Sequence, residues 1–197
     1  MDERLDHADI LKKAASAILL GDIDGAGALI ESEYPFEPIE PKKRRSSADR
    51  LVRFAVRDGF IDRYSGKKLV NPGFLRTLSI LLPETFPFTP HWSMKEAHIA
   101  YWELTPTLDH VDPIANGGKD DDVNIVTTSM LNNSLKSNWR LEDMQGWSLH
   151  EPGRIQDWDG LSSAFLKLAE EHPEVLENST IKSYHRATRK HLPSSSQ

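Results

Sequence analysis

The chain has 197 residues, of which 38% are hydrophobic and 27% are charged, a balance typical of a folded globular protein. It contains no cysteine, which excludes disulfides, thiolate zinc sites, iron–sulfur clusters and cysteine nucleophiles. No run of about 18 apolar residues occurs, and the acidic N-terminus lacks the apolar segment of a secretory signal. We therefore expect no membrane contact and a cytoplasmic location.

The net charge of −6 conceals a strong local contrast. Residues 1–40 carry 3 basic and 10 acidic side chains, whereas residues 41–68 carry 10 basic and 3 acidic ones. A phosphate backbone meets the local field of a protein surface and not its net charge. The basic segment is therefore a candidate surface for nucleic acid.

The N-terminal region, residues 1–40, is predicted to form a helical hairpin. Gly21 is a suitable stop between a first helix and a shorter second one. The apolar face of the first helix would consist of Leu11, Ala15, Ile18 and Leu19. Pro35, Pro38 and Pro41 then predict an extended linker.

Two basic features follow the linker. The first is a run of four cations, Lys42, Lys43, Arg44 and Arg45. The second is an amphipathic helix predicted over residues 48–58 and ended by Gly59, on which Arg50, Arg53 and Arg57 share one face. Such a stripe is commonly a solvated helix face, but beside a basic run it also suits contact with the DNA backbone.

The middle of the chain predicts strands and an insertion. Residues 64–67 should form a turn between two short strands. The proline- and aromatic-rich residues 71–103 should form an ordered irregular insertion packed on the core. Two further strands, at residues 104–110 and 124–127, would flank a glycine loop and lead into a helix over residues 130–138.

The C-terminal region predicts less order. A helix containing Leu161, Phe165 and Leu168 would end at Pro173. The tail from Asn178 is basic, has no acidic residue and is expected to be flexible.

Polar residues of complementary chemistry gather around the second strand pair. Asp109 and His110 end its first strand, Asn124 begins its second strand, and Asn133 lies on the helix that follows. This order would bring a carboxylate, an imidazole and an amide oxygen to one pocket. The adjacent acids Asp120–Asp122 in the loop are expected to face solvent instead.

These groups suit hydrolysis of a phosphodiester. A hard divalent cation prefers oxygen ligands such as Asp109 and an asparagine carbonyl, and it leaves positions for water and phosphate oxygens. A neutral histidine such as His110 can take a proton from an attacking water. A backbone carbonyl or the Asn124 amide could fix the orientation of the imidazole.

The spacing of these residues resembles the HNH, or ββα-metal, nuclease motif. In that family the middle asparagine lies fourteen residues after the histidine, as Asn124 does after His110, and the third motif residue lies nine further on, as Asn133 does. A basic residue commonly follows three positions later, where Lys136 stands. The match covers roughly residues 104–140.

The resemblance implies that Asp109 and Asn133 bind one Mg²⁺ or Mn²⁺ ion. Asn132 is an alternative to Asn133 by residue type, but the spacing favours Asn133.

The resemblance also implies that His110 is the general base. Asn124 would brace both the hairpin and the histidine, and Lys136 or Arg140 could hold a phosphate.

Many members of that family hold a structural zinc with two Cys-x-x-Cys knuckles. The corresponding positions are Asp62, Ser65, Ser129 and Asn132. Because these residues lack the thiolates that make such sites tight, we expect no structural zinc. Packing by the aromatic residues of the insertion 74–102, by Trp139 and by Trp147 is expected to stabilise the knuckle instead.

The sequence thus predicts an α+β fold: a ββα-metal (HNH) nuclease core with an N-terminal helical hairpin and a C-terminal helical extension. The expected domains are residues 1–40, 41–150 and 151–197. The implied function is metal-dependent hydrolysis of DNA to 5′-phosphate and 3′-hydroxyl ends, by analogy in restriction, phage defence or phage DNA processing.

Three alternatives stay open. They are a catalytically silent nucleic-acid-binding module, a delivered nuclease toxin and an RNA substrate in place of DNA. A homodimer would be the simple way to cut both strands with one site per chain.

Overall fold

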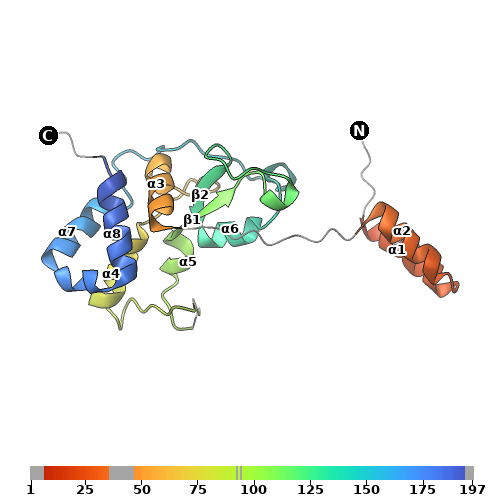
Figure 1. The fold of residues 1–197 in the computed structure, drawn as a ribbon, viewed down its shortest axis with the longest axis horizontal. Helices are drawn as coiled ribbons and strands as arrows, with labels where there is room; N and C mark the ends of the chain where they lie inside the picture. The colour runs from red at the N-terminus through yellow and green to blue at the C-terminus, as the bar shows by residue number, and fades with distance from the viewer. Residues whose placement is uncertain (1–6, 36–46, 92, 94, 194–197) are drawn as a thin grey trace. The chain divides into compact units, whose positions relative to one another are not determined.

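The computed structural model describes residues 7–35, 47–91, 93 and 95–193 (Figure 1). The chain divides into two compact units, Met1–Lys43 and Arg44–Gln197. In its described residues the first unit is helical, and the second combines helices with a two-stranded antiparallel sheet. The protein therefore has the mixed composition of an α+β fold. None of the described helices is both long and apolar enough to cross a membrane.

The first unit contains a hairpin of α1 (His7–Leu19) and α2 (Ile23–Glu33). The predicted helices are confirmed, but the predicted apolar face of α1 is wrong. Leu19 is 87% exposed, whereas Ile10 and Ala14 are each 2% exposed. Ile10 and Ala14 lie one helical turn apart, so they share the face of α1 that is buried.

The second unit begins with α3 (Ala48–Asp58), the predicted basic helix. The Ser47 hydroxyl accepts a hydrogen bond from Arg50 N and caps its start. Gly59 ends the helix with a φ of 72°, a left-handed conformation that favours glycine. The start and the end of this helix are therefore as predicted.

A narrow turn follows, without the two short strands predicted around it. One isolated bridge pairs Ile61 with Lys68, and Gly66 N donates to Asp62 O at 2.7 Å. The pairing stops there because the chain enters the next helix directly after Asn71.

The irregular insertion predicted over residues 71–103 is wrong at both ends. It contains α4 (Pro72–Leu81) and begins α5 (Ala100–Leu104). Asn71 caps α4, and Pro72 stands in its first turn, where a backbone N–H has no helical partner in any case. The predicted packing of this segment on the core is confirmed by the buried ring of Tyr101, which lies against Phe86 and Phe88.

The strand pair that carries the motif consists of β1 (Pro106–His110) and β2 (Ile125–Ser129), and α6 (Met130–Lys136) follows β2 directly. The antiparallel register sets His110 opposite Ile125. The order strand, loop, strand, helix is the one predicted. Short 3-10 turns also occur, namely η1 (Ile114–Asn116), η2 (Leu141–Asp143) and η3 (Pro173–Glu177).

The C-terminal part contributes α7 (Ser162–Glu171) and α8 (Ser179–His191), and α8 packs alongside α3 (Figure 1). The flexible tail predicted from Asn178 is therefore wrong for residues 179–191. Asn178 caps α8, and Ile181 and Thr188 are fully buried on its inner side. Packing of this inner side against the rest of the second unit, above all against α3, orders the segment in spite of its charge.

The four positions that the resemblance assigns to zinc ligands converge on the buried carboxylate of Asp62. One of its oxygens accepts hydrogen bonds from Tyr64 N and Ser65 N at 2.9 and 3.1 Å. The other accepts from Ser129 N and Asn132 Nδ2 at 2.9 and 2.8 Å. A hydrogen-bonded carboxylate thus ties the turn to the start of α6.

The expected packing by tryptophans is only partly right. Trp147 does lie on the turn, with its ring centroid 5.4 Å from that of Tyr64. Trp139 is 61% exposed, so its predicted packing role is wrong. It follows the end of α6 at Ser137, where the chain leaves the core with a φ of 49°.

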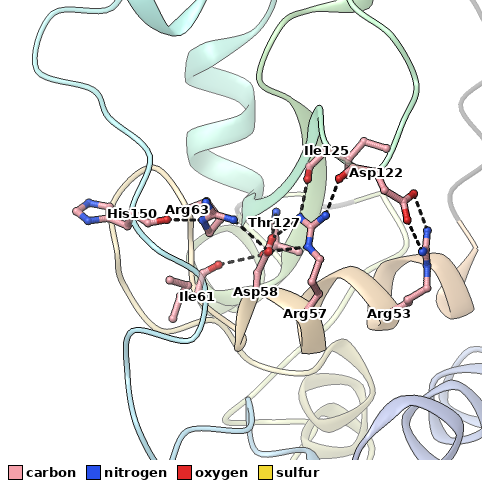
Figure 2. Close-up of polar contacts among 9 residues, drawn as sticks. All are labelled: Arg53, Arg57, Asp58, Ile61, Arg63, Asp122, Ile125, Thr127 and His150. Atoms are coloured by element: carbon pink, nitrogen blue, oxygen red, sulfur yellow. Dashed lines mark hydrogen bonds and ion pairs between the residues drawn. The ribbon is translucent and has the colours of Figure 1, made fainter.

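A second buried carboxylate, that of Asp58, holds β2 against the end of α3 (Figure 2). It accepts hydrogen bonds from Thr127 N at 2.8 Å and Thr127 Oγ1 at 2.9 Å. Arg57 and Arg63 pair with its other oxygen at 2.9 and 3.2 Å. The buried charge is therefore both paired and hydrogen-bonded.

Replacing Asp62 with Asn should lower the free energy of unfolding by about 2–3 kcal/mol, because the amide group would point a donor at existing donors. Urea denaturation followed by tryptophan fluorescence would measure the change. The exposed Asp143→Asn variant is the matched control and should shift stability by less than about 0.5 kcal/mol. Equal midpoints for the two variants would contradict the bracing by Asp62.

Candidate active site

Asp109 lies at the end of β1 and is 4% exposed. Its Oδ2 accepts a hydrogen bond from the Tyr64 hydroxyl at 2.6 Å and lies 3.0 Å from Lys136 Nζ. Burial and the neighbouring negative charge of Asp109 raise the pKa of Tyr64, so the hydroxyl stays a donor. Sequence reasoning missed Tyr64, which lies 45 residues from Asp109 in the chain.

Lys136, in the last turn of α6, is fully buried. Its ammonium also donates to the backbone carbonyl of His110 at 2.8 Å. The end of α6 is therefore fastened to two successive residues of β1, and the Asp109 charge is balanced inside the protein.

The His110 ring makes a different contact. Its Nε2 lies 3.0 Å from Asp120 Oδ1, and its side chain is 13% exposed. Successive residues of a strand point to opposite faces of the sheet, so the ring turns toward the loop while the Asp109 carboxylate turns toward α6.

Asn124 closes the loop between the two strands. Its Oδ1 accepts from Asp112 N at 2.8 Å, and its Nδ2 donates to the carbonyls of Asp112 and Lys119, also at 2.8 Å. These contacts brace the hairpin, one of the two roles expected of Asn124. Among the described residues, no hydrogen bond joins it to the His110 ring, the other expected partner.

The two adjacent asparagines of α6 have separate partners. Asn132 donates to Asp62, away from the strand end. Asn133 Nδ2 donates to Thr107 Oγ1 at 2.9 Å and to Leu108 O at 3.3 Å, so its amide lies against β1 next to Asp109. The geometry therefore favours Asn133 over Asn132 as a neighbour of Asp109.

From the sequence we predicted that the side chains of Asp109, His110 and Asn133 lie in one pocket. They lie on adjacent residues of β1 and on the helix packed against it, yet within residues 95–193 no hydrogen bond joins any two of these three side chains. Asp109 and Asn133 share the side of β1 that faces α6, and His110 faces the loop.

The donor chemistry next to α6 fits a hard divalent cation. In the described part of the chain, no group donates a hydrogen bond to Asp109 Oδ1 or to Asn133 Oδ1. Neither oxygen belongs to the fully buried polar atoms that have no hydrogen-bond partner. Carboxylate and amide oxygens are the ligands that Mg²⁺ and Mn²⁺ prefer. The Lys136 ammonium beside Asp109 opposes such an ion by charge repulsion.

The arginine stripe of α3 is paired with the acidic loop that was expected to face solvent. Arg50 bonds to Asp120, and Arg53 lies 2.6 Å from Asp122 (Figure 2 for Arg53). Arg57 donates to the carbonyls of Asp122 and Ile125 at 2.7 and 2.6 Å. Asp120, Asp121 and Asp122 are exposed, as expected. The sequence did not indicate their pairing with the arginines, because the loop folds over a helix about 70 residues away in the chain.

These pairs shift the titration of the acids. The hydrogen bond from Arg50, and next the one with His110, lower the pKa of Asp120 to about 2. The hydrogen bond from Arg53 lowers the pKa of Asp122. Both loop carboxylates are therefore ionised at neutral pH and neutralise the stripe that was predicted to meet DNA.

The other predicted phosphate-binding residues divide into two groups. Arg140 lies 3.5 Å from Asp112 and donates to Asn116 O at 3.2 Å, so it also has partners within the protein. Lys42, Lys43, Arg44 and Arg45 lie outside the described residues.

Comparisons of the chain with protein-family models, with curated proteins and with solved structures found no match. The resemblance to the HNH motif therefore rests on the spacing of residues within this chain.

Replacing Lys136 with Met should lower the free energy of unfolding by about 3–5 kcal/mol, because it leaves the buried Asp109 charge without its partner. Adding Asp109→Asn in the same chain should restore part of that loss, since neither charge then stays buried alone. Thermal and urea unfolding would measure both. The exposed Lys167→Met variant is the control, and a loss no larger than that of the control would contradict the buried pair.

Proposed function

We propose that this protein is an endonuclease of the HNH type that hydrolyses DNA phosphodiester bonds with Mg²⁺ or Mn²⁺. The observation that carries the proposal is the unit β1–loop–β2–α6, with Asp109 and His110 at the end of β1. Asn133 is hydrogen-bonded to β1 on the side of Asp109, and the His110 ring lies on the loop side of the same strand. The motif spacing from His110 to Asn124 and Asn133 supports the same assignment.

His110 is the proton acceptor in this proposal. The ionised Asp120 carboxylate can only accept a hydrogen bond, so the His110 nitrogen that faces it, Nε2, carries the proton. In the neutral ring Nδ1 is then the basic nitrogen, available to take a proton from the attacking water. Asp120 thus selects the tautomer, a role usually filled by a carboxylate or carbonyl behind a catalytic histidine.

Asp109 and Asn133 are the residues that would hold the cation, through their Oδ1 atoms. A bound divalent cation would polarise the phosphate and stabilise the leaving oxygen. Lys136 orients the Asp109 carboxylate by holding its Oδ2, and Tyr64 adds a second donor to the same atom.

Contact with the DNA backbone through α3 would be an exchange. A phosphate at Arg50 or Arg53 would replace the carboxylate of Asp120 or Asp122 as the partner of the guanidinium. The Arg53–Asp122 pair is exposed and the Arg50–Asp120 pair is partly exposed. Ion pairs in contact with solvent contribute little to stability, so the exchange carries a small free-energy cost. Restriction, phage defence or phage DNA processing are the settings we propose for this activity, by analogy.

A second function, a nucleic-acid-binding module without cleavage, is favoured by one observation. The Asp109 carboxylate already has an ammonium at 3.0 Å, a cation in place of a metal. If Lys136 holds that position permanently, a divalent ion does not bind there and the pocket is inert.

Nicking of supercoiled plasmid distinguishes the two functions. With Mg²⁺ or Mn²⁺ the wild-type protein should convert the plasmid to open-circular or linear forms, and EDTA should abolish this. His110→Ala should reduce the rate by a factor of about 10² or more, because it removes the proton acceptor, and should leave DNA binding intact. Labelled RNA in the same assay tests the alternative substrate.

The exposed His91→Ala variant is the matched control and should cleave at the wild-type rate. Cleavage by His110→Ala at that same rate would remove His110 as the base. Metal-independent binding with no cleavage by the wild type would establish the binding module instead.

A further inference from the structure

The helix α8 carries an exposed basic stripe that the proposed nuclease site does not use. Its members, Lys182, Arg186 and Arg189, are spaced by four and three residues and therefore share one helix face. All three are exposed, whereas Ile181 and Thr188 on the opposite side are fully buried. The stripe was visible in the sequence only as a basic, acid-free tail.

These three cations have no acidic partner among the residues that the structure describes. Within residues 47–193 as far as they are described, no carboxylate lies within 4.0 Å of the Lys182, Arg186 or Arg189 charge. Lys190, at the edge of the stripe, pairs with Asp49 of α3 at 2.8 Å. The α8 stripe thus differs from the α3 stripe, whose arginines are neutralised by the loop.

The stripe lines an open depression of about 490 Å³, to which Leu176, His185 and Lys190 also contribute. Burial, and next the positive charge of Arg189, lower the pKa of His185, while Glu170 acts in the opposite direction. The positive potential in the depression therefore comes from the lysine and arginine side chains and not from the histidine.

We propose that the α8 stripe binds the phosphate backbone of duplex DNA, a contact that rests on the proposed nuclease function and serves to hold its substrate. From Lys182 to Arg189 the helix rises about 10 Å, and duplex DNA presents on the order of six phosphate charges over that length. Three cations without internal partners can release counterions there without breaking an existing ion pair.

The composition of this face favours a nucleic acid over a membrane surface. A helix that lies in a membrane interface presents large apolar side chains to the lipid next to its cations. The large apolar residue of α8, Ile181, points into the core, and no exposed large hydrophobic residue is found among the described residues of that helix. The exposed cations of α8, with no exposed large apolar side chain beside them on that helix, suit an array of phosphates better than a lipid surface.

α8 is also placed suitably for a substrate that reaches the motif. α3 packs against α8 and against both β1 and β2, so it lies between α8 and the strand pair (Figure 1). An α-helix with its side chains is about 10–12 Å across, and one turn of duplex DNA is about 34 Å long. A duplex bound at α8 is therefore long enough to extend past α3 to the strand pair.

The triple variant Lys182→Gln, Arg186→Gln and Arg189→Gln tests the stripe. Binding to a short fluorescent duplex should weaken on the order of tenfold at low salt, and the slope of log affinity against log salt should fall by about 2–3. The triple variant Lys12→Gln, Lys13→Gln and Lys167→Gln changes the net charge equally at scattered exposed positions and should keep the wild-type slope. Circular dichroism should be the same for all three proteins.

Three results would overturn the stripe as a DNA site. These are an unchanged salt slope in the α8 variant, an equal loss in the scattered variant, or binding of the wild type to phosphatidylserine vesicles but not to DNA. The nuclease proposal fails separately: a wild type that cleaves no plasmid, yet binds DNA through α8, would lose the nuclease function and keep the stripe.

Discussion

The Lys136 ammonium and the Asp109 carboxylate lie 3.0 Å apart in an interior from which water is nearly excluded. Neither charge could stay buried alone, since burying an unpaired ion is far costlier than burying a pair. The pair therefore requires that α6 pack on β1, and this packing sets the Asn133 amide beside Asp109. The ion pair also affects metal binding in the proposed site, because a divalent cation bound to Asp109 would have the Lys136 ammonium as its neighbour.

Two other buried carboxylates extend the same principle through the second unit. Asp58 binds β2 to the end of α3, and Asp62 binds the turn near Tyr64 to the start of α6. The turn is thus joined to α6 by one negative carboxylate and four N–H donors. At these positions the HNH motif that the sequence resembles would place thiolates around a zinc ion.

The sequence predicted the elements whose formation depends on residues close together in the chain. The helix of α3 follows from its apolar spacing and from the caps Ser47 and Gly59, and the unit β1–loop–β2–α6 follows from its pattern of strands and turns. What could not be predicted depends on partners distant in the chain. Arg50 meets Asp120, and α8 is ordered by packing on α3, and no local pattern encodes either pairing.

We propose that Asp109 and Asn133 together hold a divalent cation, and a crystal structure with Mn²⁺ tests this most directly through the anomalous scattering of the metal. We expect one manganese peak within about 2.5 Å of Asp109 Oδ1 and Asn133 Oδ1, with Lys136 still at the other carboxylate oxygen. A crystal with Mn²⁺ bound only elsewhere, and Asp109 still held by Lys136 and Tyr64 alone, would contradict the claim.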